Sequence, residues 1–351
     1  MKKKNGNVNR RNFFRKATSA AFAFTIIPGH IFSDLTYDVP DSKEEISRLG
    51  VNSREVEEKP KVSLIKLPVN FGAAMENTPF IFGDRPYLAL NYRDDTKYNT
   101  DGYKNSMYLY ILDLTTGQEI ARFGEGHSFV SVIVNGPEIN VFASEGSNYD
   151  WFQSIYRFTS TDMKTWKREL AIPQIGDEHL FNCSVCRDEH GFLMAYESNI
   201  PVQFCFKFAR SLDLANWDKI PNLIFAGVVG KEYSACPVIR YFAPYYYVIY
   251  LHASIPGHHG WVSFLARSKN LNNWELSPMN PILEADIGEG KNNSDVDLFE
   301  WEGRTWLYYA TGDQATWATV RVAMYDGPME QFFKSCFPAG EKTVVINAQT
   351  N

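Results

Sequence analysis

Three carboxylates lie at the start of segments that read as β-strands, and their spacing suits acid–base chemistry. Asp295 and Asp297 are separated by one residue, and Glu76 precedes another such segment. In a regular strand, residues i and i+2 point to the same face, so we expect Asp295 and Asp297 to be neighbours. Two like charges held close together have separated pKa values, which leaves one acid and one base. The alternative is structural, because aspartates at strand starts often bind loop N–H groups.

A short hairpin must position the two aspartates. Residues 292–309 read NNSDVDLFEWEGRTWLYY. Asp295, Asp297 and Phe299 alternate with Val296, Leu298 and Glu300, which is the period-two pattern of a half-buried strand. Glu302 and Gly303 mark a turn, and the aromatic and β-branched residues 305–309 are typical of a returning strand. The carboxylates therefore lie where a strand begins and are expected to face a central pocket.

The same hairpin pattern occurs five times along the chain. A small polar residue enters a strand, a turn follows, and an aromatic-rich strand returns; the copies begin near Asn77, His127, Asn182, Ser234 and Ser294. Their intervals of roughly 50 to 60 residues are typical of propeller blades with four strands each. The sequence therefore predicts an all-β, five-bladed β-propeller. A β-sandwich is the alternative architecture, but it does not require a fivefold repeat.

A second pattern occurs three times and ends each time on a tryptophan. Ser or Thr, then Asp or Asn, precede Trp166, Trp217 and Trp274. We expect these segments to close blades, with the tryptophans packed between neighbouring blades. The ring must also close, and we expect residues 61–67 to pair with the last blade. This predicts a propeller domain over 61–340 and a tail over 341–351.

The first sixty residues predict export. Arg10 and Arg11 follow several lysines and precede the apolar run 17–27. This order is typical of a twin-arginine signal over residues 1–30, and we expect a periplasmic or secreted protein. A basic disordered tail followed by a short core helix is the alternative. Residues 31–60 read as a linker with a short helix.

Composition excludes some classes of partner. Lys and Arg number 35 against 41 Asp and Glu, which gives a net charge of −6 without a basic face for nucleic acid. The sequence predicts no membrane span. Aromatic residues reach 15%, which favours short strands and surfaces that stack on sugars. The 5 cysteines are odd in number and scattered, so we expect buried thiols rather than disulfides or a zinc site.

The repeated hairpin, the Ser-x-Asp-Leu-x-x-Trp segment and the run Tyr245-Tyr246-Tyr247 resemble the five-bladed propeller glycoside hydrolases. That group includes families 43, 62 and 117, with the related families 32 and 130. The resemblance covers roughly residues 62–338 and implies hydrolysis of terminal or internal sugars in a funnel at the propeller axis. It implies an oligosaccharide or polysaccharide substrate and no required cofactor; a structural metal ion at the axis remains open.

The residues that carry catalysis in family 43 are replaced in this chain. Its first inner strand has Thr78-Pro79 where the family has Asp-Pro, and Glu76 lies close by. The aspartate of the third blade corresponds to Asn182, and the acid of the family corresponds to 235–237. Either the carboxylates have moved to other blades, or the protein is not a hydrolase of the standard mechanism. Asp295 and Glu76 are the preferred acid and base, and Asp297 would tune pKa values.

Further polar residues at strand ends are candidates for substrate binding. They are His127, Asn77, Asn182, Glu197, Glu232 and Arg240. His127 could act as an acid, a sugar donor or a ligand of an axial metal ion, or could simply bind the backbone. Glu197 and Glu232 could instead form ion pairs at the rim with Arg240 and Arg210. Aromatic residues in connections could stack on sugars; they are Trp151, Phe152, Trp261 and Trp317.

Three functions are compatible with this sequence. The first is an exported glycoside hydrolase that acts in exo fashion on a polysaccharide-derived oligosaccharide. The second is a phosphorylase like those of family 130, which would need Arg240, Arg93 and Lys231 to converge on phosphate. The third is a sugar-binding propeller without catalysis, which the replaced family carboxylates favour.

Overall fold

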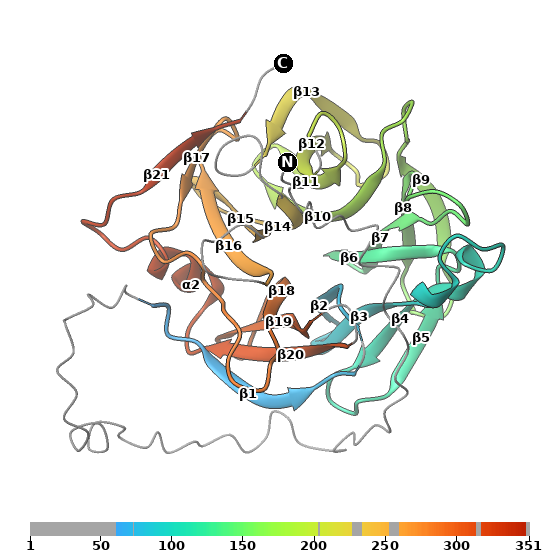
Figure 1. Ribbon diagram of the computed structural model, residues 1–351, viewed down its shortest axis with the longest axis horizontal. Helices are drawn as coiled ribbons and strands as arrows, with labels where there is room; N and C mark the ends of the chain where they lie inside the picture. Colours follow the sequence, from blue (N-terminus) through green and yellow to red (C-terminus); the bar gives the residue numbers. More distant parts are fainter. Residues whose placement is uncertain are drawn as a thin grey trace, which may run out of the picture.

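The computed structural model describes residues 61–72, 74–202, 204–226, 234–252, 260–313 and 317–348. Within these ranges the chain is almost entirely β, and its five sheets surround a common axis (Figure 1). The first strand of each repeat, β2, β6, β10, β14 or β18, lies innermost, and later strands lie progressively further out. The structure therefore confirms the predicted five-bladed β-propeller.

The first three blades each contain four consecutive antiparallel strands. Blade one contains β2 (Asn77–Phe82), β3 (Arg85–Arg93), β4 (Met107–Asp113) and β5 (Glu119–Phe123). Blade two contains β6 (His127–Asn135), β7 (Glu138–Glu145), β8 (Ile155–Ser160) and β9 (Lys167–Ile172). Blade three contains β10 (Leu180–Asp188), β11 (Gly191–Ser198), β12 (Cys205–Ser211) and β13 (Asp218–Phe225).

The last two blades each borrow a strand from a distant part of the chain. Blade four contains β14 (Ser234–Phe242), β15 (Tyr245–His252), β16 (Val262–Ser268), β17 (Asn273–Leu276) and β21 (Val344–Asn347). Blade five contains β18 (Asn292–Trp301), β19 (Arg304–Gly312), β20 (Ala318–Tyr325) and β1 (Ile65–Asn70). Short helices are η2 (Asp95–Lys97), η3 (Lys104–Ser106) and α2 (Met329–Ser335).

Strand β1 closes the ring. It runs antiparallel to β20, with Ile65 opposite Met324 and Leu67 opposite Val322. Figure 1 shows this strand, in blue, along the outer side of β20. The pairing satisfies the N–H and C=O groups that the outer edge of blade five would otherwise expose. The expected closure by residues 61–67 is thus found for 65–67.

The segment after Pro338 is not a free tail. Residues 344–347 form β21, which pairs with β17 at the outer edge of blade four. Two valines and Ile346 make this segment a good strand former, and Ile346 is buried against the core of that blade. The predicted boundary at 341 is therefore wrong, and the propeller extends to Asn347.

One apolar core fills each of the five junctions between blades. Trp274 is fully buried between blades three and four, and Trp166 stacks on Phe123 between blades one and two, with ring centroids 3.7 Å apart. Phe332 and Phe333 of α2 complete the junction of blades four and five. These contacts confirm that the repeated tryptophans pack between blades, and they hold the inner strands in a fixed arrangement.

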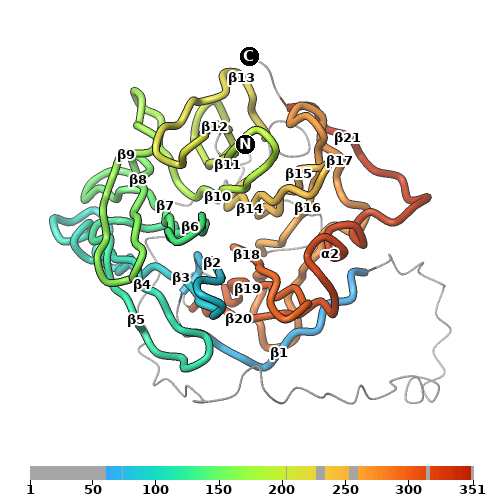
Figure 2. Tube along the Cα trace, turned by 180° about the vertical axis from the view of Figure 1, so that it is seen from behind, coloured from blue at the N-terminus to red at the C-terminus, as the bar shows by residue number. Residues whose placement is uncertain are grey.

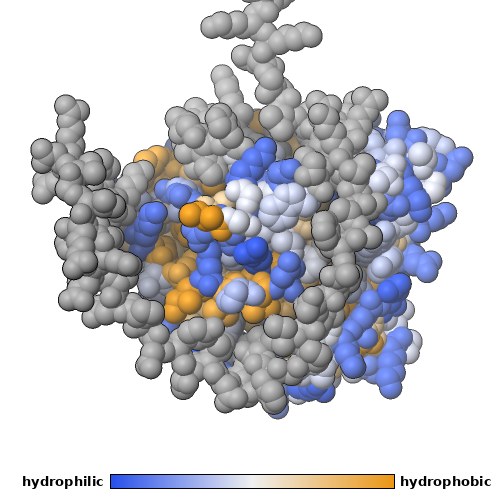
Figure 3. Space-filling view, turned by 60° about the horizontal axis from the view of Figure 1, so that its bottom comes forward, coloured by the Kyte–Doolittle hydropathy of each residue, from blue (hydrophilic) through white to orange (hydrophobic). Residues whose placement is uncertain are grey.

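The part of the propeller surface seen in Figure 3 mixes polar and apolar residues. In Figure 3, hydrophobic residues lie between hydrophilic ones at the centre of the face shown, whereas the right-hand edge is mostly hydrophilic. Seen from behind in Figure 2, the same five blades enclose the axis. Among the described residues, the helices are too short and too polar to cross a bilayer.

Candidate active site at the propeller axis

Four of the five inner strands contain a β-bulge near their first residues. The register of β6, β10, β14 and β18 shifts against the neighbouring strand, whereas β2 pairs regularly with β3. Phe129, Cys236 and Asp295 lie in three of these bulges and have φ angles of 64°, 51° and 49°. Such left-handed backbone costs about 1–3 kcal/mol per non-glycine residue, and it is concentrated at functional sites. The bulges re-aim side chains at one end of the axis.

Asp295 connects blades four, five and one. Its Oδ1 lies 2.9 Å from the thiol of Cys236, and its Oδ2 accepts a hydrogen bond of 2.6 Å from Ser294. Its backbone carbonyl accepts a hydrogen bond of 2.9 Å from Nδ2 of Asn77. The residue as a whole is buried, with an exposed fraction of 9%. Asp295 is therefore held by contacts from blades four and five, and its backbone carbonyl is held by blade one.

Glu197 connects blades three and four and is completely buried. Its Oε2 accepts hydrogen bonds from Nδ2 of Asn182, at 2.9 Å, and from the backbone N–H of Cys236, at 3.0 Å. The same Nδ2 lies 3.3 Å from the sulfur of Cys236. Both predicted substrate-binding residues of blade three thus converge on Cys236, and their orientation is fixed by hydrogen bonds.

Glu76 lies beside a buried arginine of blade one. Oε1 of Glu76 is 3.7 Å from Nη1 of Arg93, and Oε2 accepts a hydrogen bond of 3.4 Å from Asn91. Arg93 also pairs with Asp95 at 2.8 Å and donates to Ser128 at 3.0 Å. Burial opposes the charge of this guanidinium, but the two carboxylates outweigh burial and raise the pKa of Arg93. Arg93 therefore remains cationic beside Glu76.

Two further hydrogen bonds complete a circle around the axis. The backbone N–H of Phe129 donates to Asn91 at 3.2 Å, and Ser144 donates to the carbonyl of Phe181 at 2.6 Å. Hydrogen bonds now cross all five blade junctions at the same end of the propeller. We call this set the axial ring; its members are Glu76, Asn77, Asn91, Arg93, Ser128, Phe129, Ser144, Phe181, Asn182, Glu197, Cys236 and Asp295.

Asp295 and Asp297 do not form the expected pair on one strand face. The bulge in β18 lies between Ser294 and Asp297, so one extra residue interrupts the alternation. Asp295 consequently turns into the axial ring, whereas Asp297 contacts a different set of partners. The sequence pattern gave no sign of the bulge, because a strand with a bulge and a regular strand can have the same alternation.

Asp297 belongs to an ion pair two residues further along β18. Its Oδ1 lies 2.5 Å from Arg240 and accepts the N–H of Leu298 at 2.7 Å, and the Thr78 hydroxyl also bonds to it. Arg240 extends to Ser184 of blade three, at 3.4 Å. Desolvation raises the pKa of Asp297, against the opposing effect of Arg240. This network ties four blades together beyond the axial ring, and Asp297 is one of its members.

His127 lies outside the axial ring. Its Nδ1 lies 2.8 Å from the carbonyl of Glu125, and Nε of Arg168 donates to its Nε2 at 3.2 Å. The ring packs edge-on against Tyr156 and Phe158. Burial lowers the pKa of His127 to about 4, so the imidazole is neutral at physiological pH. The predicted roles of acid, sugar donor and metal ligand are not supported, because both ring nitrogens are already used.

Asn77 carries an unsatisfied atom next to Asp295. The amide nitrogen of Asn77 donates to Asp295 and, at 3.2 Å, to the carbonyl of Met75. Its Oδ1 is buried and has no hydrogen-bond donor in the described part of the chain. Buried polar atoms are nearly always paired, so a ligand hydroxyl or a bound water is the natural partner for this oxygen.

Aromatic residues surround the axial ring. Phe129 packs edge-to-face on Phe152, with centroids 4.4 Å apart, and Trp151 stacks on Phe204 at 5.9 Å. Phe152 is buried and is therefore a packing residue, whereas Trp151 and Trp261 are partly exposed. These two tryptophans remain the candidates for stacking on a sugar ring.

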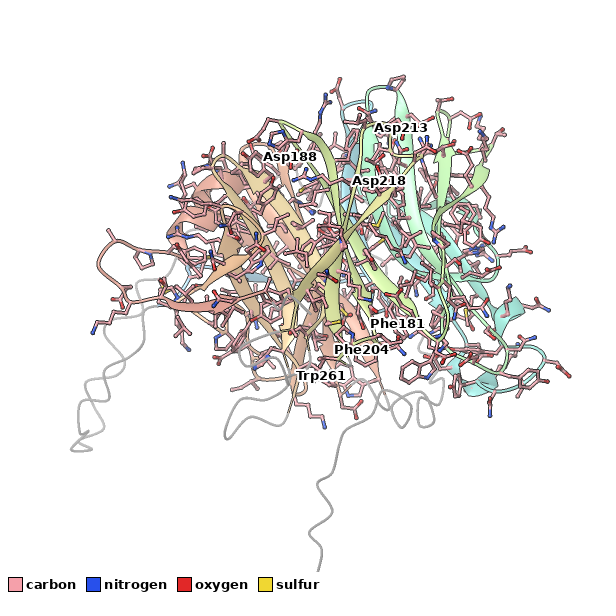
Figure 4. All side chains as sticks on the ribbon, turned by 90° about the horizontal axis from the view of Figure 1, so that it is seen from above. Phe181, Asp188, Phe204, Asp213, Asp218 and Trp261 are labelled. Carbon is pink, nitrogen blue, oxygen red and sulfur yellow. The ribbon has the colours of Figure 1, made fainter. Side chains whose placement is uncertain are left out.

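Figure 4 shows that the two ends of the propeller differ. Phe181, Phe204 and Trp261 lie at one end, and Asp188, Asp213 and Asp218 lie at the other. The axial ring contains Phe181, so it lies at the aromatic end.

Several predicted contacts are replaced or lie outside the described residues. Glu232 is outside them. Glu197 belongs to the axial ring rather than to a rim ion pair, since Arg240 has the partner given above and Arg210 pairs with Asp188. No group of three or more His, Cys, Asp or Glu within the described ranges is placed to hold a metal ion.

Cys236 is the residue that sequence reasoning missed. It was expected to be an inert buried thiol, but its sulfur contacts Asp295 and Asn182. The other described cysteines lie in blade cores, where desolvation raises the thiol pKa of Cys183, Cys186 and Cys336. One signal was available, since Cys236 lies in the tripeptide 235–237 that corresponds to the acid of family 43.

The fold is similar to that of several solved structures, although the sequence has no close relatives among the proteins compared. No protein-family model matches the sequence, and no curated protein matches it. A solved glycoside hydrolase superimposes with a TM-score of 0.58 at 14% identity, over 79% of this chain and 95% of that one. The Bacteroides ovatus xyloglucan PUL protein GH43B gives 0.54 at 14%, over 74% and 54%. The GH32 β-fructofuranosidase of Bombyx mori gives 0.50 at 13%, over 75% and 61%.

At identities this low, the superpositions show the fold alone. The chemistry has to be argued from the residues of the site. The chain spans between half and two thirds of the length of the Bacteroides and Bombyx proteins. The chain thus has the five-bladed β-propeller fold found in solved glycoside hydrolases of the GH43 and GH32 type.

Proposed function

We propose that this protein is a glycoside hydrolase that acts on an oligosaccharide in the axial site. The observation that carries the proposal is the convergence of Glu76, Glu197 and Asp295, from blades one, three and five, on one hydrogen-bonded ring. Glycoside hydrolysis normally needs two carboxyl groups around the scissile bond. The fold shared with solved glycoside hydrolases supports the same conclusion.

Asp295 is the first catalytic candidate and Glu76 the second. Asp295 retains exposed surface and receives hydrogen bonds at both carboxylate oxygens, which suits an ionised group that activates water or attacks the sugar. Glu76 lies beside the cation of Arg93. Glu197 is completely buried, so it acts as a positioning residue. The unpaired oxygen of Asn77 would accept a sugar hydroxyl.

We propose that the oligosaccharide enters the site with one of its chain ends first. The ion pair of Asp297 and Arg240 links four blades beyond the axial ring. An ion pair that links blades in this way favours a site closed at one end over an open channel. A closed pocket favours the release of terminal sugars from a polysaccharide-derived oligosaccharide. The partly exposed Trp151 and Trp261 would stack on the sugar at the aromatic end.

Turnover of defined substrates tests the proposal. The purified protein would be incubated with aryl glycosides and with oligosaccharides labelled at the reducing end, and the products would be separated by chromatography. We expect release of one terminal unit at a time and none with Asp295→Asn. Azide would restore turnover of Asp295→Ala if Asp295 is the nucleophile or base, whereas an acid variant would retain activity on substrates with good leaving groups.

The two alternative functions give different results in the same experiment. Tight oligosaccharide binding without turnover would indicate a sugar-binding propeller, and product formation that requires phosphate would indicate a phosphorylase. The phosphorylase has less support, because Arg93 and Arg240 already pair with carboxylates. Lys231 lies outside the described residues.

Export by a twin-arginine signal is part of the proposal. The signal over residues 1–30 and the linker over 31–60 lie outside the described residues, so this part rests on the sequence. We expect the protein in the periplasmic or secreted fraction. Changing Arg10 and Arg11 to Lys should retain it in the cytoplasm, and unchanged export of that variant would refute a twin-arginine signal.

A further inference from the structure

The thiol of Cys236 has a defined direction of hydrogen bonding. Nδ2 of Asn182 carries only donors, so it donates to the sulfur across 3.3 Å. The thiol has a single proton, and Oδ1 of Asp295 lies 2.9 Å away as an acceptor. The chain of donors therefore runs from Asn182 through Cys236 to Asp295.

The backbone of Cys236 is fixed independently of its thiol. Its N–H donates to Glu197 at 3.0 Å, and its φ of 51° places it in the bulge of β14. Asp295 lies in the matching bulge of β18, with a φ of 49°. Both residues therefore have strained backbone conformations, and these direct the thiol of Cys236 at the carboxylate of the neighbouring blade.

The surroundings of Cys236 differ from those of the other described cysteines. Cys205 and Cys336 direct their sulfur at backbone carbonyls of nearby residues in their own part of the chain. Cys236 contacts side chains from two other blades. Cys236 lies in an apolar cluster as well, but its sulfur bonds to polar side chains of two neighbouring blades rather than to nearby backbone.

We propose that Cys236 is a positioning residue, whose thiol orients the carboxylate of Asp295 for reaction. This inference rests on the proposed catalytic role of Asp295. Removing the thiol takes away one of the contacts that fix the orientation of the Asp295 carboxylate. Misplacement of a reacting group lowers the rate of the chemical step more than it lowers binding. Serine retains a donor at the same position, and alanine does not.

Kinetics of two variants and a matched control test this role. We expect Cys236→Ala to lower kcat by about 10- to 100-fold, since a hydrogen bond to a charged group is lost, with little change in KM. Cys236→Ser should restore most of the activity. Cys205→Ala, which removes a thiol of blade three whose sulfur contacts the backbone carbonyls of Ser198 and Ile200, should leave kcat unchanged. Full activity of Cys236→Ala would overturn the proposal.

Infrared spectroscopy separates this inference from the proposed activity. The S–H stretching band of Cys236 can be assigned by subtracting the spectrum of Cys236→Ser, and it requires no substrate. We expect Asp295→Asn to shift that band, because a hydrogen bond to a charged acceptor becomes one to a neutral amide. The band of Cys205 should not move. An unshifted Cys236 band would refute the thiol contact, whereas a shifted band without turnover of any glycoside would refute the proposed hydrolysis alone.

Discussion

The two ends of the propeller use similar residues for different purposes. In the axial ring, Asp, Asn and Ser side chains bond across blade junctions, as Asn77 does to Asp295. At the opposite end, the hydrogen bonds found within the described ranges for the turn between β12 and β13 are local to that turn. Asp213 accepts the N–H groups of Ala215, at 2.9 Å, and Asn216, at 2.8 Å.

These local hydrogen bonds explain the repeated segment that ends on tryptophan. The backbone N–H of Asn216 and its side chain lower the pKa of Asp213. Leu214 adopts a φ of 64°, and its carbonyl accepts the indole N–H of Trp217 at 2.9 Å. The two ends therefore differ in how far apart in the sequence their hydrogen-bonded residues lie. The turn stabilises one blade, whereas the axial ring requires all five. Only the ring can bring distant carboxylates together.

Asp295→Asn should produce the largest effect. We expect a loss of glycoside turnover of about 10²- to 10⁴-fold, since an amide neither accepts a proton nor attacks the sugar at a useful rate. Stability should change little, and Asp213→Asn at the opposite end serves as the control with normal turnover. Steady-state kinetics and a denaturant titration check both statements. Normal activity of the first variant would remove Asp295 from the reaction.

Asp297→Asn should act on stability. It leaves the partly buried guanidinium of Arg240 without its buried carboxylate partner, and breaking a fully buried pair costs about 3–5 kcal/mol, which is the upper bound here. Urea denaturation measures the free energy of unfolding. Asp326→Asn, which breaks an exposed pair with Arg304, is the matched control and should cost less than about 1 kcal/mol. Equal effects of the two substitutions would contradict the structural role of Asp297.

His127 should make the protein less stable in acid. Its pKa is lowered to about 4 in the folded chain from 6.5, so below pH 6.5 the unfolded state binds the extra proton. Stability is present above pH 6.5 and falls by about 2–3 kcal/mol as the pH drops to 4. The free energy of unfolding measured across this pH range should fall steeply with decreasing pH in the native protein and less steeply in His127→Gln. Identical slopes would show that this imidazole is not the cause.

Ser211→Ala should have the smallest effect of the four. It removes the hydroxyl that accepts the N–H groups of Leu214, at 2.9 Å, and Asp213, at 3.2 Å. The loss of these local hydrogen bonds costs about 1–2 kcal/mol in all. Turnover should stay normal, because the turn lies at the end opposite the axial ring. A thermal melt together with the kinetic assay tests this, and impaired turnover with normal stability would show that the two ends are coupled.

The fold could be predicted because its signals are local or repeated. Alternating strands, turns and the tryptophan segments each depend on a few neighbouring residues, and five copies at similar intervals leave few architectures. The outer strand β21 was missed because four residues, 344–347, are too short to give periodicity, and only the free edge of β17 shows that they must pair.

The site could be predicted only in part. The sequence pointed to Asp295, Glu76 and Asn182 because they lie near the starts of inner strands, and to Glu197 because it lies near the end of the second strand of blade three. It could not separate Asp295 from Asp297, since the bulge in β18 depends on packing against other blades. Cys236 was missed for the same reason, because its partners are 54 and 59 residues away in the chain.

Closure by β1 also has a consequence for biosynthesis. Each of the first blades can hydrogen-bond its own strands as it leaves the ribosome, but β1 has to wait for β20. Asn77 near the beginning and Asp295 near the end likewise meet only when the circle is complete. A partly synthesised chain can therefore hold folded blades while the axial site does not yet exist, and the site arises in one late step.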